Sequence, residues 1–280
     1  MRIRGRLTQC WAWLSMLAVC GVIAFLFLYI FIQGAHVINW DFLTKAPGGA
    51  VLGTEGGIFP AIVGSLLFTL TAVVLGGIPA IATALFMVFY CPTERIGSIV
   101  RMVVQCIAGI PSIVLGLFSY SFLVRDLNWG RCILSSGVAL AIMVLPFIEV
   151  RAEKAFREMS QQMIQSSYTL GCSRVYTIMH IVLPACRGEL VSGVILGGCY
   201  AMGATAPMIF TGAVAYAAVP ASLMQPAMAL PMHLYLLLAQ GATSMDLAYG
   251  TAFVMMAVIL LSNMLATLYA RRSVKRWKQS

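Results

Sequence analysis

The chain has 280 residues, of which 61% are hydrophobic and only 10% are charged. Soluble domains carry about a quarter charged residues, so the composition excludes a soluble globular protein. Several charge-free stretches exceed the roughly 20 residues that a helix needs to cross a bilayer. The sequence therefore predicts an all-α, multi-pass membrane protein. We interpret its net charge of +9 as a report on topology and expect no nucleic-acid partner.

Six membrane-spanning helices are predicted, at about 11–32, 62–89, 102–124, 132–150, 189–214 and 248–269. The first follows a basic N-terminus, which is also the outline of a signal peptide. Its apolar run is longer than a typical signal sequence and lacks a clear cleavage site, so we expect it to remain as a span. A seven-span alternative stays open, because Leu190–Met245 has no Lys, Arg, Asp or Glu and is long enough for two crossings.

Charge and proline favour the six-span topology. On one side of the predicted spans the basic residues are only Lys45, Arg125 and Arg131, and all the others lie on the opposite side. The positive-inside rule then places both termini in the cytoplasm. A seventh crossing would move the basic tail at 271–280 outside. Prolines also interrupt residues 215–235, which we expect to form an outer or re-entrant segment.

The longest cytoplasmic connection, at about 151–188, carries a specific local pattern. Gly171 follows Leu170 at the place of a helix C-cap glycine, and Ser173 can cap a second short helix. Pro184 is expected to close that helix before the fifth span. The pattern predicts a helix–Gly–helix elbow. An ordinary solvated loop between two spans remains the alternative.

Residues 203–207 interrupt the predicted fifth span. They read Gly-Ala-Thr-Ala-Pro, and Pro207 removes a helical hydrogen bond. Irregular backbone at this depth is tolerated only inside protein or beside a watery cavity. Two interpretations stay open: a kink that lines a solute pathway and presents Thr205 to it, or an ordinary proline kink.

The sequence lacks the patterns of a catalytic or metal site. No Gly is followed by Lys, so the chain has no P-loop for ATP. His36, His180 and His233 are far apart, and the eight cysteines are scattered without a ligand pair. We therefore predict no catalytic residues, no metal and no cofactor bound by this chain. A membrane enzyme is unsupported.

The elbow resembles a known docking loop. Gly171, Ile181, Leu183 and Pro184 match the second half of the Glu-Ala-Ala–Gly loop by which permeases of type I ABC importers dock their ATPase. More narrowly, the chain resembles the PstA-type permeases of phosphate-specific transporters. Four further blocks carry this likeness: Thr54-Glu55-Gly56-Gly57-Ile58 with Gly64-Ser65-Leu66, Pro111 to Phe118, Gly203 to Pro207 with Phe210-Thr211, and Met224-Gln225-Pro226 with Leu230-Pro231.

Several charged family positions differ here. Gln165-Ser166-Ser167 replaces Glu-Ala-Ala, Ala204 replaces a Glu, and Tyr200 falls where an Arg is typical. An Arg-Thr-Thr-Glu motif reads Val150-Arg151-Ala152-Glu153. The resemblance implies a set of residues for coupling to the ATPase: Gln165, Gly171, Ser173, Arg174, Ile181, Leu183 and Pro184. It implies a second set for the solute path: Arg151, Glu153, Tyr200, Gly203 and Thr205.

The resemblance implies a fold, a function and an assembly. The fold is the six-helix type I ABC importer permease fold, with a permease domain at 58–270 between an N-terminal segment (1–57) and the basic tail. The function is ATP-driven import of inorganic phosphate across the plasma (bacterial inner) membrane. The partners are a PstC-like second permease, two PstB-like subunits that hold ATP and Mg, and an external PstS-like phosphate-binding protein. A secondary carrier or channel for a small polar solute is the alternative.

Overall fold

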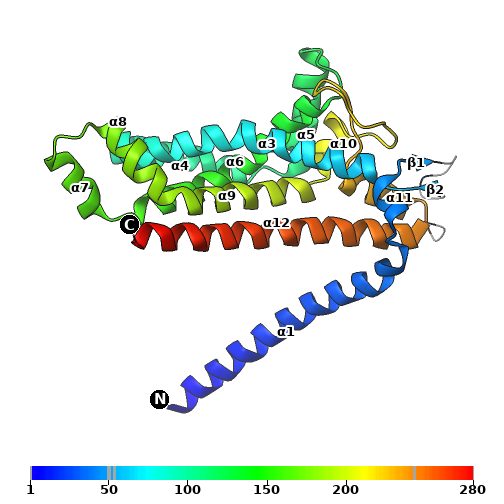
Figure 1. The fold of residues 1–280 in the computed structure, drawn as a ribbon, viewed down its shortest axis with the longest axis horizontal. Helices are drawn as coiled ribbons and strands as arrows, with labels where there is room; N and C mark the ends of the chain where they lie inside the picture. The colour runs from blue at the N-terminus through cyan, green and yellow to red at the C-terminus, as the bar shows by residue number, and fades with distance from the viewer. Residues whose placement is uncertain (1, 49–51, 53–54, 242–243, 280) are drawn as a thin grey trace. The chain divides into compact units, whose positions relative to one another are not determined.

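The computed structural model describes residues 2–48, 52, 55–241 and 244–279, and most of them are helical (Figure 1). The prediction of an all-α protein is therefore confirmed. The chain divides into two compact units. The first joins Met1–Phe59 to Leu234–Met256, and the second joins Pro60–His233 to Ala257–Ser280.

The first unit pairs the N-terminal helix with the start of the last one. Its elements are α1 (Arg2–Gly34), the 3-10 turn Ala35–Val37, α2 (Trp40–Thr44), the antiparallel pair β1 (Pro47–Gly48) and β2 (Glu55–Gly56), α11 (Leu230–Ala239) from Leu234 onward, and the first turns of α12 (Met245–Gln279). Aromatic rings join α1 to α12: Tyr29 meets Tyr249 edge-on at 5.8 Å, and Phe31 lies 5.4 Å from Phe253. These contacts hold the end of α1 against α12.

The second unit contains most of the remaining helices. They are α3 (Phe59–Leu85) with the π-helical turn Phe86–Tyr90, α4 (Glu94–Ala108), α5 (Ser112–Ser119) with the π-helical turn Tyr120–Asp126, α6 (Ile133–Arg157), α7 (Gln161–Thr169), α8 (Arg174–Thr177) with the π-helical turn Ile178–Val182, α9 (Leu183–Gly203), α10 (Ala206–Thr211) and the first turn of α11 (Leu230–Ala239).

Five stretches in the described part of the chain are long and apolar enough to cross a membrane: Thr8–Val37, Phe59–Tyr90, Ile133–Arg157, Arg174–Gly203 and Met245–Ala270. The pair α4–α5 makes a sixth if both helices form one span, bent by 92°. The prediction of one continuous helix at 102–124 is therefore wrong. Pro111 lacks an N–H and disfavours helical geometry in the residue before it, so the helix stops at Ala108.

The fifth predicted span begins earlier and ends earlier than expected. Helical backbone runs without interruption from Arg174 to Gly203, so the prediction that Pro184 closes a separate short helix is wrong. Pro184 lies in the first turn of α9, directly after the π-helical turn. The wider hydrogen-bonding pattern of a π turn accommodates a residue without an N–H. At the other end the helix stops at Gly203, where residues 204 and 205 separate it from α10.

Helix α6 forms the core of the second unit, side by side with α3 and α9 (Figure 1). Two glycines allow the close packing. A Cβ on Gly76 of α3 would lie 2.7 Å from the carbonyl oxygen of Ala141, and one on Gly197 of α9 would lie 2.8 Å from Ile148. Neither position has room for a side chain, so small residues set the helix spacing, as is common in membrane proteins. These three packed helices position the elbow, the break after Gly203 and the ion pairs of Glu153.

Candidate functional site

The connection between α6 and α9 folds as the predicted helix–Gly–helix elbow. Helix α7 ends at Thr169, and Gly171 follows with φ of +83°. A Cβ on Gly171 would meet open space, so its backbone conformation, and not crowding, favours glycine. The Ser173 hydroxyl accepts a hydrogen bond of 3.3 Å from the Tyr176 N–H and caps α8. The predicted conformations at Gly171 and Ser173 are confirmed.

The two arms of the elbow are fixed to each other. The buried hydroxyls of Ser167 on α7 and Thr177 on α8 lie 2.7 Å apart and form a hydrogen bond. The Cys172 N–H donates to the Ser167 carbonyl at 3.2 Å. Beyond α8, Leu183 packs on a buried cluster that includes Phe156 of α6 and Val182. The elbow is therefore attached firmly to the helices of the second unit.

The predicted coupling residues fall into an exposed and an anchoring group. The exposed ones are Gln165, Gly171, Ser173 and Arg174, and the half-buried ones are Ile181, Leu183 and Pro184. Large apolar side chains surround the exposed group: Leu170 at the bend is 83% exposed, and Val175 on α8 is 60% exposed. The sequence analysis did not single out this apolar surface as a contact. Leu170 directly precedes the left-handed turn at Gly171.

The break between α9 and α10 lines a cavity of about 390 Å³. Its walls carry the predicted residues Tyr200, Gly203 and Thr205, together with Ser112 at the start of α5 and other neighbours. Ala204 is extended (φ −78°, ψ 120°), and the Thr205 side chain makes no capping hydrogen bond to α10. Its hydroxyl is thus free of the usual helix-capping role. The Tyr200 ring rests on Phe147 at 4.3 Å.

The structure does not bring the two predicted charges into this cavity. Arg151 and Glu153 are two residues apart on α6, and side chains at that spacing point to different faces of a helix. Arg151 lines a separate cavity of about 240 Å³ with Glu189 and Ser192. Glu153 faces α4. Ser112 is a hydroxyl that the sequence analysis missed as an individual site residue, although it lies within the Pro111–Phe118 block.

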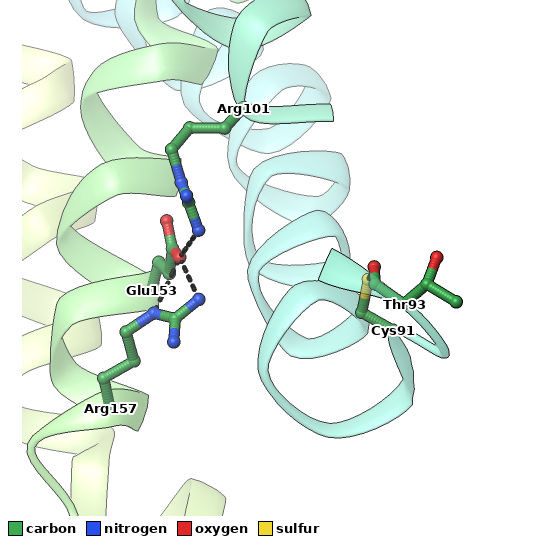
Figure 2. A network of polar contacts seen from close by, with 5 residues as sticks. All are labelled: Cys91, Thr93, Arg101, Glu153 and Arg157. Atoms are coloured by element: carbon green, nitrogen blue, oxygen red, sulfur yellow. Dashed lines mark hydrogen bonds and ion pairs between the residues drawn. The ribbon is translucent and has the colours of Figure 1, made fainter. Parts of the chain in front are cut away.

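Glu153 is the centre of an ion-pair cluster between α4 and α6 (Figure 2). Its Oε1 accepts from the Arg101 guanidinium at 3.1 Å, and from both Nε and a terminal nitrogen of Arg157 at 2.7 Å. The carboxylate side chain is 11% exposed, whereas those of the two arginines are about half exposed. A cavity of about 500 Å³, lined in part by Ser98, lies beside both guanidiniums. Arg101 and Arg157 were not predicted as site residues.

The sequence blocks that carried the resemblance pack against one another. The Leu230 N–H donates to the Ser65 hydroxyl at 2.8 Å, which joins α3 to the start of α11. Gly116 on α5 lies against Pro207 on α10. Each contact joins residues of two different blocks.

Comparison with known proteins identifies the family of this chain. The model of the family "Binding-protein-dependent transport system inner membrane component" matches residues 92–279. The chain belongs to this family. It is therefore a multi-pass inner-membrane protein and a permease of the ABC importer type, a class that generally lacks enzymatic activity of its own.

Two relatives of the chain are named as PstA permeases. The chain is 30% identical over 208 residues to the "probable phosphate transport system permease protein PstA" of Methanocaldococcus jannaschii, covering 74% of this chain and 73% of the relative. It is 26% identical to "phosphate transport system permease protein PstA 2" of Mycobacterium bovis, over 88% of this chain and 80% of the relative. It is thus similar to PstA-type permeases along most of its length.

A solved structure shares the fold. One chain of a bacterial ABC transporter involved in import of the acidic polysaccharide alginate superposes with a TM-score of 0.62. The match covers 97% of this chain and 99% of that one, at 17% identity. Because the identity is low, the match supports conclusions about the fold only. It confirms the type I ABC importer permease fold.

Proposed function

We propose that the chain is the PstA-type permease subunit of an ATP-driven importer of inorganic phosphate, with both termini and the elbow in the cytoplasm. The observation that carries the proposal is the single helical rod from Arg174 to Gly203. It starts at the exposed elbow and ends at the cavity that holds Tyr200 and Thr205. Thirty residues of helix span about 45 Å, enough to link an ATPase outside the membrane to a solute site within it.

The rod gives the chain a mechanical role in transport. A helix moves as a rigid body because its backbone is hydrogen-bonded along its length, so a push on the elbow displaces the Gly203 end. The hydrogen bond between Ser167 and Thr177 joins the two arms of the elbow and stabilises their arrangement. The break at residues 204 and 205 then allows the cavity to change shape while α10 stays packed on α5.

The cavity recognises phosphate through hydroxyls and not through a cation of this chain. Tyr200, Thr205 and Ser112 supply donors, and none of the residues that form its walls is charged. Few fixed charges in a path favour release as well as binding. Positive potential then comes from a PstC-like second permease. A PstS-like protein delivers the phosphate, and two PstB-like subunits hold the ATP and Mg.

Assembly with the ATPase tests this function. The chain, expressed with the other subunits of its own transport system, should co-purify with the ATP-binding subunit. Burying a Leu side chain contributes roughly 1.5–3 kcal/mol, so Leu170→Asp should reduce co-purification about tenfold or more. Leu170→Met keeps the apolar contact and should bind normally.

Uptake of labelled phosphate into vesicles completes the test. It should require ATP and the co-purified ATPase. Uptake that proceeds without ATP, together with equal ATPase recovery from both Leu170 variants, would contradict the proposal and favour a secondary carrier.

A further inference from the structure

One acidic side chain in the second unit lacks the pairing that its neighbour has. Glu149 lies on α6 and is only 1% exposed. Its Oε1 makes no hydrogen bond to any described residue. Buried carboxylates in native proteins are almost always paired, so an unpartnered one requires an explanation.

The spacing along α6 supplies that explanation. Glu149, Glu153 and Arg157 follow each other at intervals of four residues, and side chains at this interval share one helix face. Arg101 on α4 meets this row at Glu153 (Figure 2). The charged groups near Glu149 are the carboxylate of Glu153 and the guanidiniums of Arg101 and Arg157. Glu149 is therefore the next acidic position along the row, one turn from the present partner of Arg101.

The observed pairing is uneven. Glu153 Oε1 accepts from two guanidiniums, while Glu149 Oε1 accepts from none. If Arg101 moved to Glu149, Arg157 would stay on Glu153, and each carboxylate would have one cation. Both arrangements keep Glu153 neutralised, so the exchange exposes no unpaired charge at that position.

Helix α4 is flanked by non-helical backbone at both ends. It is bounded by the non-helical residues Cys91–Thr93 on one side and by the bend at residues 109–111 on the other. The Arg101 side chain is 47% exposed and borders the cavity of about 500 Å³. A shift of α4 along α6 by up to one helical turn, about 5.4 Å, brings Arg101 level with Glu149.

We propose that Glu149 is a second docking position for Arg101, and that α4 moves along α6 to exchange the Arg101–Glu153 ion pair for an Arg101–Glu149 pair during transport. Glu149 is then a positioning residue that stabilises the alternative state of the permease. This inference rests on the proposed function, because ATP drives the change of state.

Zero-length cross-linking tests the exchange directly. Arg101→Lys places an amine that a hydrophobic carbodiimide can join to a nearby carboxylate, in the complete complex with its ATPase. Without nucleotide, mass spectrometry should find position 101 joined to Glu153. After vanadate traps the nucleotide, the link should move to Glu149, with the ratio of the two products changing about tenfold. Lys154 on α6 and Glu158, the residue that follows the helix, lie 3.6 Å apart and provide an internal control that should cross-link equally in both states.

The outcomes separate the two proposals. Trapped nucleotide with an unchanged link to Glu153 would overturn the exchange and leave the proposed function intact. A complex that neither binds nor traps nucleotide would overturn both.

A second variant keeps the test valid if Arg101→Lys does not assemble. Glu149→Gln removes the second docking position without disturbing the Arg101–Glu153 pair. We expect normal assembly and a fall of at least tenfold in phosphate uptake, with partial recovery in Glu149→Asp. If Glu149 were merely structural, the neutral amide would transport normally, and that result would overturn the proposal. Glu158→Gln, at an exposed acid directly after the same helix, is the control and should transport normally.

Discussion

The two ends of the Arg174–Gly203 rod are built in opposite ways. At the elbow, Ser173 caps the helix and a buried pair of hydroxyls joins the two arms. At the other end, Thr205 leaves α10 without a side-chain cap, and its hydroxyl belongs to a cavity wall. The elbow end has its local hydrogen bonds satisfied by the protein, whereas Thr205 at the other end caps no helix and lines a cavity. This difference fits a helix whose elbow end is fixed to the rest of the protein and whose other end borders the cavity.

The largest effect of a single hydroxyl is expected at the cavity. Thr205→Val keeps the shape of the side chain and removes the donor that we assign to phosphate. A hydrogen bond to a charged group contributes about 1.5–3 kcal/mol, so uptake should fall about tenfold or more. Thr267→Val is the matched control, because that hydroxyl bonds only to the Asn263 carbonyl of its own helix. Equal uptake by both variants would show that the path does not pass Thr205.

A smaller effect is expected at the elbow. Ser167→Ala removes the 2.7 Å bond between the two buried hydroxyls and leaves Thr177 with its 3.1 Å bond to the Ser173 carbonyl, which costs about 1 kcal/mol. Hydrogen exchange of the α8 amides should therefore accelerate about fivefold, with a modest fall in uptake. Adding Thr177→Val should accelerate exchange little further, because the hydroxyl pair is already broken. Exchange that is equally slow in all three proteins would show that the pair does not fix the elbow.

The sequence predicted those parts of the site that depend on local backbone chemistry. Gly171 and Ser173 occupy the conformations expected of them, since a C-cap glycine and an N-cap serine act within a few residues. The interruption after Gly203 was likewise predicted from Pro207. The proposed roles of these residues in coupling and solute binding remain predictions.

Two kinds of feature could not be predicted from the sequence: contacts between residues far apart in the chain, and the effect of a residue that depends on its three-dimensional setting. Arg101 and Glu153 are 52 residues apart, and no periodicity connects them. Arg151 was grouped with the solute path, yet the helical rotation of α6 directs it to another cavity. Pro111 was recognised only as part of a family block, and its effect on the predicted third span was missed. Pro184 was expected to end a helix, but the preceding π-helical turn accommodates it.

The central claim is that the elbow conformation couples ATP hydrolysis to movement at the cavity. A pair of variants at Gly171 tests it most directly, because a Cβ there would meet no other atom of this chain, whereas the positive φ of its backbone disfavours most side chains. Asparagine tolerates positive φ, whereas a β-branched residue loses roughly 1–2 kcal/mol there. Phosphate imported per ATP hydrolysed should be measured in reconstituted vesicles for Gly171→Asn and Gly171→Val. We predict a nearly normal ratio for Gly171→Asn and about a tenfold lower ratio for Gly171→Val; equal, normal ratios in both would contradict the account.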